Sequence, residues 1–291
     1  MYLERTNDRR LPEDYTGDIL LWDIDKTYLE THFSSWRGLL AIPFEFAIDK
    51  SPLPGAVPLL RALRHGPGDE PRLTPLYFVS GSPPELRPVI TKRMILDGVE
   101  YDGITFKDQL GLLLAGRVRE ITRQVGYKLE ALLRYRLELP AGARWLCFGD
   151  DVESDAEIFA LFGEVCAGLR GGALDGRLRS YGVHADQIRE CIALAERLPI
   201  TPDPVERIFI HLSGGSDPAR FDDPRVVAAY SYLQTALVLL QMERIRPEAV
   251  TAVAKDLRRR RIPEQEIRRQ LLDANVRFGV PLEWSLLTAQ R

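Results

Sequence analysis

Two aspartates, Asp23 and Asp25, stand two residues apart at the end of the apolar run in DILLWDIDKT. Side chains at this spacing in a strand point to the same side, so both carboxylates are expected at the carboxyl end of one strand. They repel each other there unless a shared proton or a cation intervenes. Mg²⁺ suits such a site because it takes few carboxylates and keeps positions for water and phosphate. A solvated turn after a strand is the alternative interpretation.

A second apolar run, in LYFVSGSPPEL, ends in the small residues Ser80 and Gly81, and a helix is expected just after Pro84. The Ser80 hydroxyl, neighbouring backbone N–H groups such as that of Gly81, and the helix N-terminus can together bind a phosphate. A strand followed by a serine–proline helix cap is the alternative interpretation.

A third apolar run leads into acids in WLCFGDDVESDAEIF. Asp150 stands where a strand end would add a second metal carboxylate, and Gly149 would let the backbone approach closely. Asp155 follows five residues after Asp150. Glu153 and Glu157 are interpreted as acids that complement the dipole of the following helix.

Lys128 lies at the edge of an apolar helical stripe. The stripe consists of Val118, Ile121, Val125, Leu129 and Leu132. A lysine half turned towards the core is expected to have a partner, although a buried stem with a solvated ammonium group is the alternative. A new helix that began at Gly126 would weaken the stripe.

The elements that position these residues alternate between strand-like and helix-like segments, which predicts an α/β fold with a parallel sheet and crossover helices. The predicted strands are Asp18–Asp25, Pro75–Gly81, Asp102–Lys107, Arg144–Asp150 and Glu164–Leu169, with Arg207–Leu212 as a further candidate. The helices predicted between them are Val57–Arg64, Glu85–Asp97, Val118–Leu137 and Glu153–Leu161. Continuous apolar runs are typical of strands covered on both faces.

The character of the sequence changes after about Thr201, where segments rich in turn formers follow, and beyond Pro224 the sequence predicts only helices. These helices are Val226–Arg244, Pro247–Arg261, Pro263–Phe278 and Leu282–Ala289. We therefore expect a catalytic domain over residues 1–200 and a helical accessory domain over residues 201–291. The uncharged stretch from Val226 to Met242 is short for a membrane span, and its polar stripe favours a helix buried in a bundle.

The composition excludes several classes of protein. The chain has 291 residues, 45% of them hydrophobic, which is too apolar for a disordered chain. A net charge of −3 gives no overall electrostatic attraction to nucleic acid. The three separated cysteines predict neither a disulfide framework nor a structural zinc site. The first fifteen residues lack the apolar core of a signal peptide, and we expect a cytoplasmic protein without a transmembrane segment.

Four parts of the chain occur in the order of the four haloacid-dehalogenase (HAD) superfamily motifs. They are the segment from Asp23 to Thr27, Ser80, Lys128 and the block from Gly149 to Asp155. More narrowly, the chain resembles the catalytic domain of actin-patch-associated phosphatidate phosphatases and their bacterial relatives. Their DIDDT, YVSxSP and GDSGExDxEIY segments correspond to DIDKT, YFVSGSP and GDDVESDAEIF here. Their lysine about a dozen residues before an "fP" pair corresponds to Lys128, twelve residues before Pro140.

The resemblance covers roughly Asp18 to Leu169, and it departs from the narrower family at two points. Lys26 replaces an aspartate in the first motif and adds a positive charge beside the expected metal. Asp151 and Val152 replace the Ser-Gly pair of GDSGE. Both departures leave the reacting acids in place and bear on the choice of substrate.

The resemblance implies a HAD-like Rossmannoid sheet and a role for each motif residue. Asp23 would be the nucleophile that forms an aspartyl-phosphate, and Asp25 the general acid and then the general base. Mg²⁺ would be held by Asp23, the backbone carbonyl of Asp25 and Asp150. Ser80, Gly81 and Lys128 would bind the phosphate oxygens. Asp151 and Asp155 would orient Lys128 or the waters on the metal.

The function predicted from this resemblance is Mg²⁺-dependent hydrolysis of a phosphomonoester, with a phosphatidate-like lipid as the narrower candidate substrate. The alternatives are the same chemistry on a soluble metabolite or on a nucleic-acid phosphate end, and a catalytically silent HAD-like binding module. Residues 28–54 are a candidate cap, or a segment packed on the C-terminal helices. The arginine run at residues 258–261 is either a face for anionic membrane or RNA, or a solvated helix face.

Overall fold

A seven-stranded sheet forms the centre of the computed structural model, which describes residues 3–30, 51–108 and 124–289. The strand order is β1-β4-β3-β2-β5-β6-β7. Every neighbouring pair is parallel except β1 with β4, which is antiparallel at one edge. The strands span β1 (Leu3–Arg5), β2 (Asp18–Asp23), β3 (Leu76–Ser80), β4 (Gly103–Lys107), β5 (Arg144–Asp150), β6 (Val205–His211) and β7 (Val226–Ala229).

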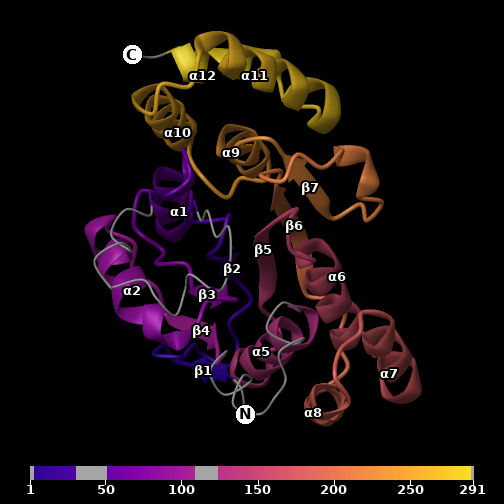
Figure 1. Cartoon of the computed structure of the whole chain (residues 1–291). Coiled ribbons are helices and arrows are strands. Elements are labelled where there is room, and N and C mark those ends of the chain that lie inside the picture. The colour runs from indigo at the N-terminus through magenta and orange to yellow at the C-terminus, as the bar shows by residue number, and fades with distance from the viewer. Residues whose placement is uncertain (1–2, 31–50, 109–123, 290–291) are drawn as a thin grey trace.

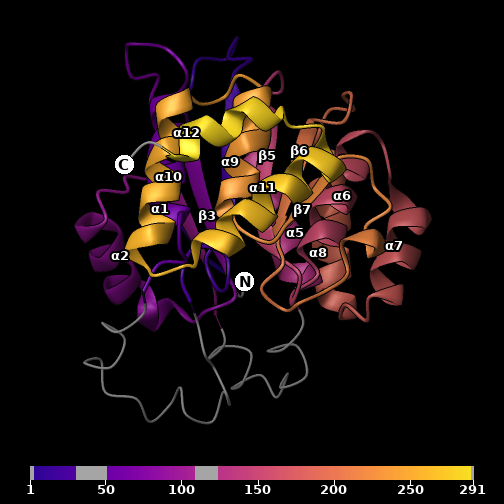
Figure 2. The ribbon, with the colours of Figure 1, turned by 90° about the horizontal axis from the view of Figure 1, so that it is seen from above.

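Helices cover both faces of the sheet (Figures 1 and 2). On one face lie α1 (Ala56–His65), α2 (Arg87–Leu96), α9 (Tyr232–Gln241), α10 (Pro247–Arg259) and α11 (Glu264–Phe278). On the other lie α5 (Val125–Glu138), α6 (Asp155–Cys166), α7 (Gly171–Ser180) and α8 (Ala185–Arg197). The short helix α12 (Ser285–Ala289) packs on α10. Three 3₁₀ turns complete the described elements: η3 (Pro84–Leu86), η4 (Pro218–Arg220) and η5 (Leu282–Trp284).

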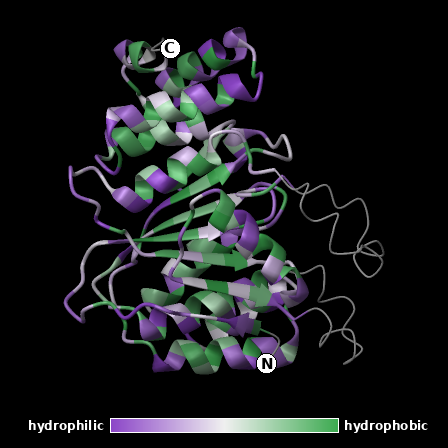
Figure 3. Ribbon diagram, turned by 90° about the vertical axis from the view of Figure 1, so that its left-hand side faces the viewer, coloured by the Kyte–Doolittle hydropathy of each residue, from purple (hydrophilic) through white to green (hydrophobic). Residues whose placement is uncertain are grey.

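Alternation along the strands divides the core into two layers. On β2 and β5, Trp22 and Phe148 face the layer formed with α1, α2 and α9, and their rings stack 4.3 Å apart. Their neighbours Leu21 and Cys147 face the layer formed with α5, α6 and α8. The central strands are therefore apolar on both sides, as Figure 3 shows. This confirms the α/β fold and explains why these strands are continuous apolar runs in the sequence.

The strand order changes direction between β2 and β5. From β2 the chain builds β3 and β4 on one side, then returns to build β5, β6 and β7 on the other. Such a switch point leaves a crevice at the carboxyl ends of the two diverging strands, where open α/β sheets bind ligands. Asp23 ends β2 and Asp150 ends β5, so two of the predicted site residues flank this point.

Two predicted elements are wrong. Glu164–Leu169, predicted as a strand, forms the last turn of α6 and the turn after it. The predicted helix Val226–Arg244 contains strand β7, which pairs with β6, before α9 begins at Tyr232. Short apolar runs occur both in buried strands and in buried helices, so hydrophobicity alone cannot separate them.

The remaining predicted strands and helices are present where the structure describes them, with shifts of a few residues at their ends. Residues 118–123 of one predicted helix lie outside the described part of the chain, and α5 begins at Val125. Helices α7 and α8 were not predicted. Strands β6 and β7 extend the sheet beyond residue 200, and the division into two domains there stays a prediction. Among the described residues, every helix is too short or too polar to cross a bilayer.

Candidate functional site

Strand ends and one helix bring the predicted site residues together at the switch point. Asp23 is the last residue of β2, and Asp25 follows it after one apolar residue. Ser80 ends β3 beside β2, and Asp150 ends β5 on its other side. Lys128 lies in the first turn of α5. All five side chains are buried.

Lys128 lies among three carboxylates, one from the end of β2 and two from the segment around the start of α6. Its Nζ atom is 2.9 Å from Asp23 Oδ1 and 2.6 Å from Glu153 Oε2, and it also binds Asp155 Oδ1. The side chain of Lys128 is 1% exposed, so the alternative of a solvated ammonium group is wrong. The sequence predicts a partner for this lysine, and in the structure three acids fill that role.

Asp23, Glu153 and Asp155 form a buried acidic cluster that could hold a metal ion, because their ligand atoms lie within 4.8 Å of one another. The Lys128 ammonium group already lies between them and binds all three acids. A metal ion bound by all three would have to share or displace that lysine, at a large electrostatic cost.

A second set of oxygens has no such cation. Asp23 Oδ2, Asp25 Oδ1 and Asp150 Oδ2 are buried and accept no hydrogen bond within the described part of the chain. Buried polar atoms are nearly always paired, so unpartnered carboxylate oxygens indicate a ligand. With Glu153 and Asp155, five acids gather at this edge, and the ion pairs that they form within the described part of the chain all involve Lys128. Such a cluster of carboxylates favours bound protons or a further cation.

Burial and the crowding of these acids also account for the pKa shifts of Asp23, Asp150 and Lys128. Burial raises the pKa of the Asp23 carboxyl well above its usual range, while Lys128 opposes the rise. Burial, followed by repulsion from Asp155 and Glu153, raises the pKa of Asp150 to about 7. Burial alone would lower the pKa of Lys128, but Asp155, Asp23 and Glu153 together raise it well above its usual value. Lys128 is therefore a permanent cation, and the acids compete for positive charge.

Two serine hydroxyls hold Asp25 in place. Ser80 Oγ donates to Asp25 Oδ2 over 2.9 Å, and Ser82 Oγ donates to the same oxygen over 2.8 Å. The backbone N–H of Ser82 in turn donates to Ser80 Oγ over 3.0 Å. Because a serine hydroxyl has one proton, Ser80 must turn away from Asp25 to donate to a phosphate. A side chain at Gly81 would meet the amide group of Gln124, which would have to move away.

The segment after β5 folds back on its own strand end. Asp150 Oδ1 accepts the N–H groups of Val152 and Glu153 over 2.5 and 2.9 Å. Asp155 Oδ2 accepts the Asp150 N–H over 3.2 Å. A side chain at Gly149 would collide with Asp155, so the glycine permits the close approach expected from the sequence.

Asp151 contacts a different part of the chain from Lys128. Its carboxylate accepts the N–H groups of Gly214 and Ser216 over 2.6 and 2.8 Å, which ties the loop after β6 to the end of β5. Burial opposes ionisation, but these backbone hydrogen bonds outweigh it and lower the pKa of Asp151. The predicted role of Asp151 in orienting Lys128 or metal waters stays a prediction.

Asp151→Ala is expected to lower the free energy of unfolding by about 1–3 kcal/mol, because two part-buried N–H groups lose a charged acceptor. Urea denaturation followed by circular dichroism measures the change. Asp222→Ala removes an exposed carboxylate a few residues further along the same connection and is the control. Equal stability of the two variants would contradict the anchoring role.

The C-terminal helices reach this edge of the sheet through Tyr232. The Tyr232 hydroxyl donates to the backbone carbonyl of Thr27, in the turn after β2. Its ring stacks on His211 at 5.1 Å and on Trp22 at 5.6 Å. Burial lowers the pKa of His211 to about 4, so this imidazole is neutral at physiological pH. Helix α9 thus supports the first motif by packing and by one hydrogen bond.

No family model, curated protein or solved structure matches this chain. What the fold and the site establish is an α/β protein with a largely parallel, Rossmann-like sheet and a buried acidic cluster that could hold a metal ion.

Sequence reasoning missed two residues of the site. Glu153 was interpreted as a helix-dipole acid, but α6 begins only at Asp155, which leaves Glu153 in the preceding turn to bind Lys128. Ser82 has no role in the sequence prediction, whereas in the structure its hydroxyl binds Asp25. The spacing of two between Glu153 and Asp155, and between Ser80 and Ser82, was the available signal. The candidate cap at residues 28–54 lies mostly outside the described residues.

Proposed function

We propose that this chain is a Mg²⁺-dependent phosphatase of the HAD type that hydrolyses a phosphomonoester through an aspartyl-phosphate. The observation that carries the proposal is the set of unpartnered oxygens of Asp23, Asp25 and Asp150 at the switch point, with Lys128 beside Asp23. The order of the four sequence motifs supports the same assignment.

The donor set fits a magnesium ion. Mg²⁺ prefers oxygen ligands and is usually bound by one or two carboxylates together with phosphate and water. Asp23 and Asp150 offer buried carboxylate oxygens, and the backbone carbonyl of Asp25 is the third expected ligand. When bound, the ion would supply positive charge that lets a carboxylate approach a phosphoryl group.

In the proposed first step an oxygen of the Asp23 carboxylate attacks phosphorus, and the bond from phosphorus to the ester oxygen breaks. Asp25 gives its proton to the leaving oxygen through Oδ1, since Oδ2 is held by Ser80 and Ser82. In the second step Asp25 takes a proton from water, which attacks the phosphorus and releases phosphate and the Asp23 carboxylate.

Lys128 would bind the phosphoryl group in this scheme. Its ammonium group lies 2.9 Å from Asp23 Oδ1, so it can neutralise a phosphoryl oxygen transferred to Asp23. Glu153 and Asp155 hold it there. The amide of Gln124 donates to Glu153 Oε1 over 3.1 Å and fixes that acid in turn.

The decisive experiment measures phosphate release by the purified chain from p-nitrophenyl phosphate and from phosphatidate in detergent micelles. We expect turnover with Mg²⁺ and a loss of about 100-fold or more in EDTA, because the ion contributes several kcal/mol to the transition state. Adding Mg²⁺ back in excess must restore the rate.

The relative rates on the two substrates separate the lipid proposal from that of a soluble metabolite. Turnover of p-nitrophenyl phosphate but not of phosphatidate favours a soluble phosphomonoester. If a broad panel that includes phosphorylated nucleic-acid ends yields no Mg²⁺-dependent phosphate, the phosphatase proposal is wrong and the binding-module alternative gains support.

A further inference from the structure

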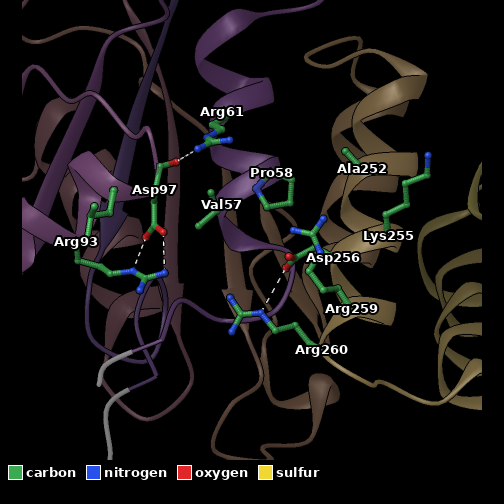
Figure 4. A pocket seen from close by; sticks show the side chains of 11 residues that line it. Val57, Pro58, Arg61, Arg93, Asp97, Ala252, Lys255, Asp256, Arg259 and Arg260 are labelled. Atoms are coloured by element: carbon green, nitrogen blue, oxygen red, sulfur yellow. Dashed lines mark hydrogen bonds and ion pairs between the residues drawn. The ribbon is translucent and has the colours of Figure 1, made fainter. Parts of the chain in front are cut away.

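A cationic hollow of about 460 Å³ lies between α1, α2 and α10, away from the acidic site. Figure 4 shows the side chains that line it, which come from all three helices. Its cations are Arg61, Arg93, Lys255, Arg259 and Arg260. Two carboxylates also line it, so positive charge is in excess.

Both carboxylates already bind other groups of the protein. Asp97 binds Arg93 through two hydrogen bonds of 2.9 and 2.7 Å and accepts the Tyr28 hydroxyl over 2.6 Å. Asp256 accepts the Gly55 N–H over 2.8 Å at the start of α1 and lies 4.0 Å from Arg260. Neither acid is placed to neutralise the remaining cations.

Three cations of the hollow form no ion pair with the residues that the structure describes. Lys255 and Arg259 are exposed and form no ion pair with any residue that the structure describes. They stand four residues apart on α10, where like charges repel each other. Arg61 donates to the backbone carbonyl of Asp97, a neutral acceptor, and so keeps its charge. A helix surface with this pattern is stabilised by an anion.

We propose that this hollow binds a phosphorylated group with two or more negative charges, as a soluble molecule or as the headgroup of a lipid. Guanidinium groups match phosphate oxygens with paired donors, and charge-assisted hydrogen bonds of this kind are strong. The volume lies within the range of small-molecule sites. The proposal is independent of the phosphatase assignment, because the hollow shares no residue with the acidic site.

The test is isothermal titration of the full chain with pyrophosphate and with inositol hexakisphosphate. Lys255→Gln/Arg259→Gln removes two exposed cations of the hollow that have no ion pair in the described part of the chain. Lys92→Gln/Arg268→Gln removes one lysine and one arginine that are also exposed but do not line the hollow, and is the matched control.

We expect saturable binding by the wild type, an affinity about 100-fold weaker in the hollow variant, at about tenfold for each lost cation, and little change in the control. Absence of saturable binding, or an equal loss in both double variants, would overturn the proposal, because an equal loss indicates only general attraction.

Co-sedimentation with phosphatidylcholine vesicles, with and without phosphatidylinositol bisphosphate, identifies the source of the phosphate. Binding that requires the bisphosphate lipid and is lost in the hollow variant supports a headgroup. Binding of the soluble probes alone supports a soluble ligand. Vesicle binding that survives in the hollow variant contradicts a role for the hollow at the membrane.

Discussion

Asp23→Asn is expected to abolish phosphate release, with a fall in kcat of about 10³-fold or more. An amide oxygen is a poor nucleophile and cannot form the acyl phosphate on which the proposed reaction depends. The substitution keeps the shape of the side chain, so binding of substrate is expected to change less than turnover. Steady-state kinetics with p-nitrophenyl phosphate measures both quantities.

The same variant is expected to stay folded, which separates lost chemistry from lost structure. Burial already opposes the charge on Asp23 and raises its pKa, so a neutral amide removes an unfavourable buried charge. Lys128 keeps its contacts with Glu153 and Asp155. Urea denaturation should therefore give a free energy of unfolding equal to or above that of the wild type.

Asp18→Asn is the matched control, since Asp18 begins the strand that Asp23 ends. Asp18 pairs with Arg144 and Arg244 at the opposite edge of the sheet, and its loss should leave turnover unchanged. Mass spectrometry of rapidly quenched wild type should find one added phosphoryl group on Asp23. Full turnover by Asp23→Asn would show that another residue is the nucleophile.

The sequence predicted the acids of the first motif because their position depends only on local geometry. An apolar run that ends in Asp23-Ile24-Asp25 places two carboxylates at one strand end whatever the remaining strands do. That these acids flank a switch point depends on the order of the strands in space. Alternation of strands and helices does not fix that order, so the residue pattern alone did not place Ser80 and Asp150 beside Asp23, and only the family resemblance implied that grouping.

The contact between Lys128 and Glu153 could not be predicted from the pattern of the sequence. Lys128 lies 105 residues from Asp23, and its place at the edge of an apolar stripe predicted a partner without naming it. The role of Glu153 depended on whether α6 began before or after it, and helix ends are uncertain by a residue or two. The strand–helix junction before Tyr232 was hidden because β7 and α9 are both apolar and uncharged.

Lys128→Met is expected to lower the free energy of unfolding by about 3–5 kcal/mol, the usual cost of leaving buried charges without their partner. Methionine fills a similar space without the charge. Asp23, Glu153 and Asp155 would then face one another with no cation between them. Urea denaturation at neutral pH in EDTA measures the loss, and Lys92→Met, at an exposed position, should show none.

The loss should depend on pH in a defined direction. Burial raises the pKa of Asp23 and of Glu153, and removing Lys128 raises both further. A carboxyl whose pKa is higher in the folded state than in the unfolded state costs nothing while both states are protonated. Its cost grows as the pH rises above the unfolded pKa and levels off above the folded pKa. The Lys128→Met deficit should therefore shrink as the pH is lowered towards about 4. A deficit that stays constant with pH would indicate a packing defect instead.

The effect of Mg²⁺ on the free energy of unfolding distinguishes the two candidate sets of ligand oxygens. An ion held by Asp23, Asp25 and Asp150 should stabilise the wild type, because Lys128 leaves those oxygens unpartnered. An ion held by Asp23, Glu153 and Asp155 should stabilise mainly Lys128→Met, where the ammonium group no longer occupies the position. Asp150→Asn decides between them: it should remove the Mg²⁺-dependent gain of the wild type only if Asp150 is a ligand.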